Sequence, residues 1–403
     1  MQDRVSLYPG RVKLEPVAGQ ANLYDLTRAD QPTQEGTPLN KASLLKDATA
    51  ALLGLGTSAV PDDAFLVLAL GSGYYGYRVK VQLADGTPVE GATVTGISAL
   101  PGSSLVTGAD GIAVGRSSSA SVTIGCSSPY IDQKAPTSQS VASTGTVTDV
   151  TLTLSNNTGM QTINSSKTAR ISPLAKTLDL TAVGGGGGGG GRLDWKAVSN
   201  YRIAYTASGG GGGGYAETVM AHPLSNNKKI DITVGSGGSA GSYVYSESAP
   251  GLHGGTGGTT VVKIDDTAIC TANGGKGGSG GKNRDDPPLG GNGNGAGGRG
   301  GYGDSNYDGG PGIAGSKYIF NEQSLGLAGG GGGGGGNSSG YNTGNVGGTP
   351  NGGDGYRSGD GSIPAKAGAV MGGGGGGGQI QNNSSIYDSK SGGAGGVYLR
   401  FHF

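Results

Sequence analysis

The sequence predicts a mainly β protein. We expect short N-terminal helices, a small antiparallel β-sandwich, and a C-terminal glycine-rich domain that combines a polyglycine II helix bundle with flanking β-strands. Three observations support this fold class. Apolar and polar residues alternate over several short segments, which is typical of half-buried strands. Helix signals are confined to residues 40–70. Glycine is unevenly distributed, since residues 1–183 hold 18 of the 90 glycines and residues 184–403 hold the other 72.

Residues 1–73 are expected to form an attachment segment. A helix over 41–53 has leucine and alanine side chains along one face, and a second short helix is expected after Pro61, where two aspartates occupy the first turn. Two short helices cannot bury a core alone. They therefore pack either on the next domain of this chain or on another subunit or larger assembly.

Residues 74–155 read as the antiparallel β-sandwich. Val79, Val81 and Leu83 alternate with polar residues, and the dipeptides at 85–86 and 110–111 are Asp-Gly hairpin signals. The stretches LADGTPVEGATVTG, TGADGIAVG and TDVTLTLS resemble the carboxypeptidase-regulatory-like or prealbumin-like sandwich. That resemblance implies a spacer or interaction domain.

Residues 156–403 form the glycine-rich part. Clean strand alternation occurs over 178–182, 230–234 and 397–403. Between such strands lie GG-x repeats and four nearly pure glycine blocks, at 184–191, 209–214, 329–336 and 372–378.

Unbroken glycine runs are normally flexible linkers, because glycine loses the most conformational entropy on folding. Here the runs directly follow or precede strands, as in KTLDLTAVGGGGGGGG. A polyglycine II helix has three residues per turn and no internal hydrogen bonds, so neighbouring helices must pair their backbone groups. On an outer helix every third residue can carry a solvent-facing side chain, as Lys276, Ser279 and Lys282 would. We therefore expect a compact lattice that displays the loops between its helices.

The composition excludes several functional classes. The chain has 28 basic and 28 acidic residues, and no basic run suited to nucleic acid. Three histidines and two cysteines argue against a metal or disulfide framework, and we expect Cys126 and Cys270 to be free and buried. The first residues lack a signal-peptide core, and the longest apolar run, at 64–70, is far too short to span a membrane. We therefore expect neither export by the usual route nor membrane insertion.

Catalytic and cofactor motifs carry no specific signal. The G-x-S-x-G pattern occurs at 237–241, 277–281 and 336–340, as expected by chance where one residue in three is glycine. No phosphate loop has the required Ser or Thr. We expect no enzyme activity, no cofactor and no metal. One calcium candidate is Asp304, Asn306 and Asp308, but Gly315 replaces the bidentate glutamate, so an exposed loop with Asx turns is the alternative.

Tyrosines between the glycine tracts are the binding candidates. Tyrosine gives a large contact area at low entropic cost, and its neighbours here are Ser, Gly and Asn. The alternative is that some of them cap the lattice or fill the edge of the sandwich. Trp195 is expected to be a packing anchor. The candidate receptor-binding residues are Tyr243, Tyr245, Tyr302, Tyr307, Tyr341, Tyr356 and Tyr387.

The glycine-rich part and the N-terminus resemble a known family. TLDLTAVGGGGGGGG, GGTTVVKIDDTAICTANGGKGG and GGAGGVYLRFHF resemble glycine-rich tail-fibre and tail-tip proteins of tailed bacteriophages and prophages. LTRADQPTQEGTPLNKASLL is similar to the start of tail and baseplate proteins from phages of Gram-positive gut bacteria.

The resemblance implies a virion tail adhesin, made in the host cytoplasm. Its N-terminal segment would attach to other tail or baseplate proteins, and its tip would bind a bacterial surface glycan or protein. It also implies a homo-oligomer, usually a trimer. The alternatives are a structural tail, baseplate or collar component, a tip with depolymerase activity, and the tip of a phage-tail-like bacteriocin.

Overall fold

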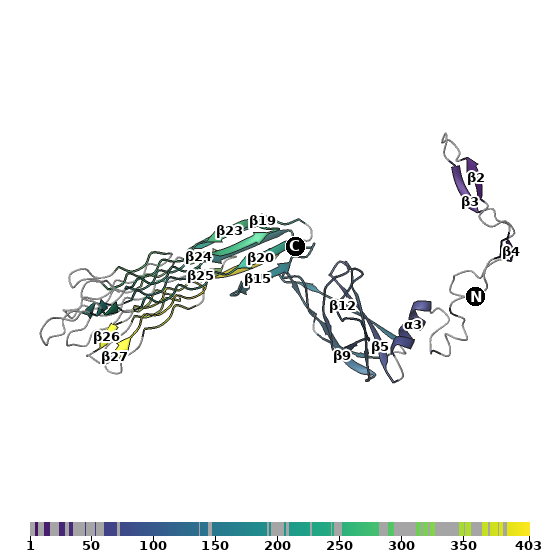
Figure 1. Ribbon diagram of the computed structural model, residues 1–403, viewed down its shortest axis with the longest axis horizontal. Helices are drawn as coiled ribbons and strands as arrows, with labels where there is room; N and C mark the ends of the chain where they lie inside the picture. Colours follow the sequence, from purple (N-terminus) through teal and green to yellow (C-terminus); the bar gives the residue numbers. More distant parts are fainter. Residues whose placement is uncertain are drawn as a thin grey trace. The chain divides into compact units, whose positions relative to one another are not determined.

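We describe the fold from a computed structural model (Figure 1). Besides short isolated segments, the structure describes residues 60–70, 73–136, 138–143, 147–191, 209–225, 228–242, 252–281, 289–293, 312–315, 346–349, 351–355, 365–369, 371–377 and 388–403. These residues are mainly β, as predicted, with one described helix. Contacts divide the chain into two compact units: Met1–Pro129 with Ala135–Ser155, and Tyr130–Lys134 with Asn156–Phe403.

The first unit contains a β-sandwich whose strands follow the predicted alternation. Tyr77, Val79 and Val81 of β5, Ile124 of β9 and Leu152 of β12 are all buried. One sheet has the order β12-β5-β8-β7 and the other has the order β11-β9-β6. The strands are β5 (Tyr75–Gln82), β6 (Val94–Thr95), β7 (Ser98–Ala99), β8 (Ile112–Ser117), β9 (Ser121–Cys126), β11 (Gln139–Ala142) and β12 (Val147–Thr153).

One pairing in this sandwich departs from the predicted antiparallel arrangement. β12 pairs with β5 in parallel, in the register Val150↔Val79. The chain crosses to the second sheet through β9 and β11 before it returns to the first, and it arrives beside β5 running in the same direction. The other pairs in this sandwich are antiparallel.

The predicted helix after Pro61 is confirmed as α3 (Pro61–Leu70). Val60 N donates to Asp63 Oδ2 at 3.0 Å, which caps the first turn, and Arg78 Nη2 donates to Asp63 Oδ1 at 2.8 Å. At the other end, Arg116 Nη1 donates to the Leu70 carbonyl oxygen at 2.8 Å. Both ends of α3 are therefore tied to strands of the sandwich.

The predicted helix over 41–53 lies outside the described residues, apart from two of its leucines. Leu45 is buried and packs with Ala64 of α3, and Leu53 is partly buried against them. Two short two-stranded sheets also precede α3, in a region where the sequence showed no strand pattern. They pair β1 (Val5–Ser6) with β4 (Pro32–Gln34) and β2 (Val12–Pro16) with β3 (Tyr24–Arg28).

The second unit contains another β-sandwich, with sheets of order β14-β28-β16-β19 and β15-β20-β22-β23. The strands predicted at 178–182, 230–234 and 397–403 are confirmed as β16 (Thr177–Val183), β20 (Lys229–Thr233) and β28 (Gly396–His402). Their partners are β14 (Gln161–Ile163), β15 (Lys167–Arg170), β19 (Ala216–Pro223), β22 (Thr260–Ile264) and β23 (Thr267–Ala272).

The core of this second sandwich consists of the inward side chains of both sheets. It includes Leu180 of β16, Ile232 of β20, Val262 of β22 and Phe401 of β28, none of which is more than 2% exposed. The side chain of Glu217 on β19 joins the two sheets, because Thr271 N donates to its Oε2 at 2.7 Å. The remaining short strands are β10 (Gln133–Lys134), β13 (Ser155–Asn156), β17 (Leu193–Asp194), β18 (Tyr205–Thr206), β21 (Val244–Tyr245), β24 (Lys317–Phe320), β25 (Gln323–Gly326), β26 (Gln379–Gln381) and β27 (Ser385–Tyr387).

Candidate functional site: a polyglycine lattice and its distal end

The glycine run 184–191 continues β16 as an extended helix that is buried along its whole length. Each of its eight backbone N–H groups donates a hydrogen bond, at N···O distances between 2.6 and 2.9 Å. The acceptors rotate with a period of three among the segments 209–215, 252–258 and 390–393. All three run antiparallel to the central run, since the acceptor number falls as the donor number rises.

Three further segments donate to the carbonyl oxygens of 184–191. These segments are 235–242, 274–281 and 372–377, and they run parallel to it. Six of its carbonyl oxygens accept bonds from described residues. The central run therefore has six neighbours, three antiparallel and three parallel. The threefold period and the lateral backbone bonds confirm the predicted bundle of polyglycine II helices, which we call the lattice.

Close approach of the backbones explains why the central run consists only of glycine. A Cβ added at any position from Gly184 to Gly191 would lie between 1.9 and 2.3 Å from a backbone carbonyl oxygen of a neighbour. Such a clash cannot be relieved by rotating a side chain. Backbone hydrogen bonds, each contributing about 1 kcal/mol net, therefore stabilise the lattice in place of side-chain packing.

The outer helices carry side chains at the predicted interval. In 235–242 every third residue from Gly235 is buried, and the serines that follow are exposed: Ser236, Ser239 and Ser242. Lys276 is also exposed, as predicted, whereas Ser279 is only half-buried. The segment 289–293 runs beside both positions, since Lys276 N donates to the Asn292 carbonyl oxygen at 2.8 Å and Ser279 N to the Leu289 carbonyl oxygen at 2.9 Å. Lys282 lies outside the described residues.

Chain direction places several connections at one end of the lattice. The runs 184–191, 235–242 and 274–281 leave the second sandwich from β16, β20 and β23. The antiparallel runs 209–215, 252–258 and 390–395 return to β19, β22 and β28. We call the end at which Gly191 lies the distal end. The connections 192–208, 243–251, 282–288 and 378–387 all start and finish there, and Figure 1 shows β26 and β27 beyond the lattice.

Two of the seven candidate tyrosines have a described backbone, and both belong to strands at the distal end. Tyr245 lies in β21, opposite Asp194 in the sheet β18-β17-β21. Tyr387 lies in β27, opposite Gln379, and β26 of that hairpin contacts β18. The structure therefore brings these two positions to the same end of the lattice. Tyr243, Tyr302, Tyr307, Tyr341 and Tyr356 lie outside the described residues, as do Trp195 and the calcium candidate Asp304, Asn306 and Asp308.

Sequence reasoning missed two apolar side chains at the distal end. Leu252 is 56% exposed and Leu289 is 48% exposed. Leu252 lies beside the last residue of the central run, because Gly191 N donates to its carbonyl oxygen at 2.6 Å. Between them in sequence, His253 accepts a hydrogen bond at Nδ1 from Gly280 N, at 3.2 Å. The available signal was a leucine within two residues of the start of a GG-x run and outside any strand pattern.

The motifs and cysteines considered as chemical candidates lie in different parts of the fold. The serines of the first two G-x-S-x-G patterns belong to extended lattice helices at 235–242 and 274–281, and the third pattern lies outside the described residues. Cys126 and Cys270 are free, as predicted. Cys270 is buried, but Cys126 is only partly buried, because it lies near the end of β9. Among the described residues, no group of His, Cys, Asp and Glu side chains has the arrangement of a metal site.

The described helix α3 has ten residues, and nothing in the described part of the chain is a helix with the length and apolarity of a membrane span. The fold and the lattice define a glycine-rich protein whose strands extend into a backbone-bonded scaffold. The glycine-rich domain family matches residues 161–402, which is more than half of the chain, and this chain belongs to that family. No curated protein matches the sequence.

Proposed function

We propose that this protein is a tail-fibre or tail-tip adhesin of a tailed bacteriophage or prophage, and that it binds the host surface through loops at the distal end of the lattice. The observation that carries the proposal is the six-neighbour packing around 184–191, from which four connections emerge at one end. A rigid scaffold holds such loops in fixed relative positions, which reduces the entropy lost on binding. The protein acts by binding, without bond-making chemistry.

The candidate contact residues are the tyrosines already named, and Tyr245 and Tyr387 are the ones to test first. Their strands belong to small sheets at the distal end. The exposed Leu252 adds apolar surface there. Aromatic and aliphatic side chains beside Ser, Gly and Asn suit either a sugar face or a protein surface.

The N-terminal segment supplies the attachment to other tail or baseplate proteins in this proposal. Phe65 and Leu68 lie three residues apart on α3, and they are 68% and 65% exposed. Because both ends of α3 are held on the sandwich, the helix presents this apolar pair to solvent. An exposed apolar pair of this kind suits a contact with another protein. The chain would thus be a virion component, assembled as a homo-oligomer such as a trimer.

The alternatives remain a structural tail, baseplate or collar role and the tip of a phage-tail-like bacteriocin. The exposed face of α3 suits attachment in each case. The discriminating measurement is direct binding of the fluorescently labelled full chain to a panel of Gram-positive gut bacteria. We expect saturable binding to a subset of strains. Binding to none of them, together with incorporation into particles, would support the structural role.

Variants locate the contact surface. We expect the combined change Tyr243→Ala, Tyr245→Ala and Tyr387→Ala to weaken cell binding by about ten-fold or more, as loss of aromatic anchors does. The matched control is Tyr215→Ala. Tyr215 is 42% exposed but lies at the sandwich end of the lattice, where its carbonyl oxygen accepts from Gly184 N. An equal loss of binding in the control variant would contradict the placement of the site.

A further inference from the structure

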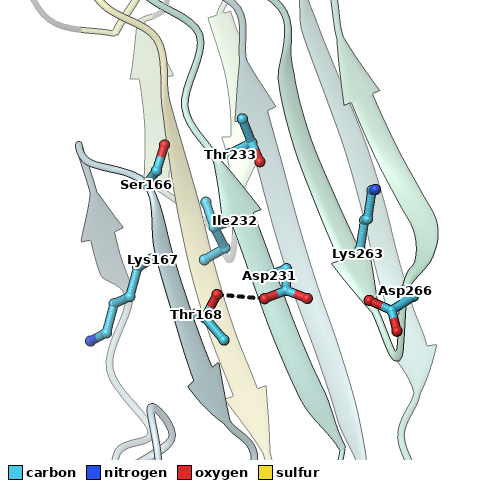
Figure 2. Close-up of a pocket in the computed structure, with 8 residues that line it drawn as sticks. All are labelled: Ser166, Lys167, Thr168, Asp231, Ile232, Thr233, Lys263 and Asp266. Carbon is cyan, nitrogen blue, oxygen red and sulfur yellow. Dashed lines mark hydrogen bonds between the residues drawn. The ribbon is translucent and has the colours of Figure 1, made fainter.

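The outer face of the sheet β15-β20-β22-β23 carries an open polar groove of about 380 Å³ (Figure 2). It lies on the second sandwich, away from the distal end of the lattice. Its volume falls within the range of about 300–1,000 Å³ that small-molecule sites occupy. Its lining residues include no aromatic side chain. A ligand would therefore be held by hydrogen bonds and charge.

Strand register builds the groove from complementary groups. Thr168 of β15 and Lys263 of β22 both lie directly opposite Asp231 of β20, so a hydroxyl, a carboxylate and an ammonium group form one row. The inward neighbours Ile230 and Ile232 fill the core, which fixes this row on the outer face. Figure 2 shows Asp231 between the Thr168 and Lys263 sides, with Lys167 directed away from it.

The carboxylate at the centre is held in place. Thr168 Oγ1 donates to Asp231 Oδ1 at 2.6 Å, and Lys229 Nζ lies 2.7 Å from Oδ2. The hydrogen bond from Lys229 and then the one from Thr168 lower the pKa of Asp231 below its ordinary value. The group is therefore an ionised acceptor at neutral pH, with lone pairs left for a ligand hydroxyl.

Three further groups offer unused bonding capacity among the described residues. Ser166 Oγ accepts from Val234 N at 3.0 Å, which leaves its O–H free to donate. Thr233 is exposed, and its hydroxyl has no partner in the described part of the chain. Lys263 is exposed too, and its ammonium group forms no ion pair within 4.0 Å among the described residues, although its charge helps to lower the pKa of Asp231. The groove thus presents hydroxyl groups, the ammonium groups of Lys167 and Lys263, and the carboxylates of Asp231 and Asp266. Both carboxylates already pair with Lys229, at 2.7 and 3.5 Å.

We propose that this groove binds an anionic saccharide or polyol unit, with Lys263 facing the carboxylate or phosphate of the ligand and Asp231, Thr233 and Ser166 facing its hydroxyl groups. This second site lies on the second sandwich and extends the proposed function. It rests on that function in one respect, namely that the bacterial surface is the source of the ligand. Because aromatic stacking is absent from the lining, we expect a Kd of about 1 mM per site. Several copies in one particle would raise the apparent affinity.

The test is a titration of the full chain with sodium glucuronate, glycerol phosphate and glucose, followed by saturation-transfer NMR. Binding of either anionic probe with at least five-fold preference over glucose supports the proposal, and the probe that binds identifies a uronate or a polyol phosphate source. Equal binding of glucose, or no binding of any probe up to about 50 mM, about fifty times the expected Kd, overturns it.

Variants connect the binding to the groove. We expect Lys263→Gln to weaken the preferred probe by about ten-fold and Thr233→Val to weaken it by a smaller factor. The control is Lys276→Gln, which removes another exposed lysine, on the lattice. Equal effects in Lys263→Gln and Lys276→Gln would overturn the placement of the site. The distal tyrosine variants should leave this titration unchanged, so a failure of the groove and a failure of the proposed adhesin function are distinguishable.

Discussion

A single methyl group in the central helix should destabilise the lattice. We choose Gly188→Ala, because its Cβ would lie 1.9 Å from the carbonyl oxygen of Ser239. Real Cβ atoms essentially never come within 3.0 Å of another heavy atom, so the helix that carries Ser239 must move outward by about 1 Å. The obstructing atom belongs to the backbone, and therefore no side-chain rotation can absorb the change.

That displacement breaks hydrogen bonds on two sides of the helix. Gly238 N donates to the Gly186 carbonyl oxygen, Gly241 N donates to the Gly189 carbonyl oxygen, and Gly255 N donates to the Ser239 carbonyl oxygen, each at 2.8 Å. Three such bonds contribute about 3 kcal/mol, and overpacking adds about 1–3 kcal/mol. The expected loss is about 4–6 kcal/mol, which is comparable to the whole stability of many domains.

Urea unfolding, followed by the fluorescence of Trp195 and by far-UV circular dichroism, measures this loss. Trp195 is the single tryptophan of the chain and follows the central run by four residues. The control is Gly159→Ala, whose Cβ would meet only the Asn157 Oδ1 atom at 3.6 Å. It should change the free energy of unfolding by no more than about 0.5 kcal/mol. If Gly188→Ala also stays within that limit, the close-packed lattice is refuted.

Two further predictions concern ionisable groups. Hydrogen bonds from the Val60 backbone and from Arg78 lower the pKa of Asp63 from 3.8, so the ionised carboxylate stabilises the fold above that pH and this contribution is lost as the pH falls through the lower folded-state pKa. Thermal unfolding from pH 6 to pH 2 should therefore show a smaller acid-induced drop in Tm for Asp63→Asn than for the wild type. Equal drops would contradict this role. Burial raises the pKa of Cys126 to about 11 and that of Cys270 to about 12; both should resist iodoacetamide at pH 8 until urea unfolds the chain, as mass spectrometry of the labelled peptides will show, and rapid labelling of native Cys270 would be inconsistent with its burial.

The lattice was predictable because the spacing of side-chain-bearing residues within each glycine run indicates whether that run can lie inside or only on the outside. Side-chain-free runs such as 184–191 can be surrounded on all sides, whereas runs with Ser or Lys at every third position can occupy only the outside, as 235–242 does. The strands were predictable for the same reason, since alternation over 397–403 matches the buried and partly exposed positions of β28.

The order of neighbours could not be predicted from spacing. The hydrogen bonds to the central run are made by backbone groups, which every glycine-rich run presents alike, so the spacing of glycines does not distinguish 209–215 from 252–258 as a partner of the central run. The order follows instead from the sandwich strands to which the runs are joined. Polar pairs between residues far apart in sequence could not be predicted for a similar reason. His402 Nε2 lies 2.8 Å from Asp179 Oδ2, and these residues are 223 positions apart in sequence.

The candidate site was predicted only in outline. Tyrosine composition indicated loops between glycine tracts, and chain direction in the structure brings the strands of Tyr245 and Tyr387 to the distal end. Receptor contact by the tyrosines stays a prediction. The polar groove was missed because Thr168, Asp231 and Lys263 come from three separate strands, and each one alone is an ordinary outward residue.

The lateral bonding of the lattice has a mechanical consequence. In the proposed adhesin, a force applied between the distal end and the second sandwich would run along the axes of the helices, whereas the hydrogen bonds lie across them. Traction would therefore shear many bonds around 184–191 at once instead of unzipping them singly. The resistance to such a force would come from the number of lateral hydrogen bonds that must break together, although each bond is weak.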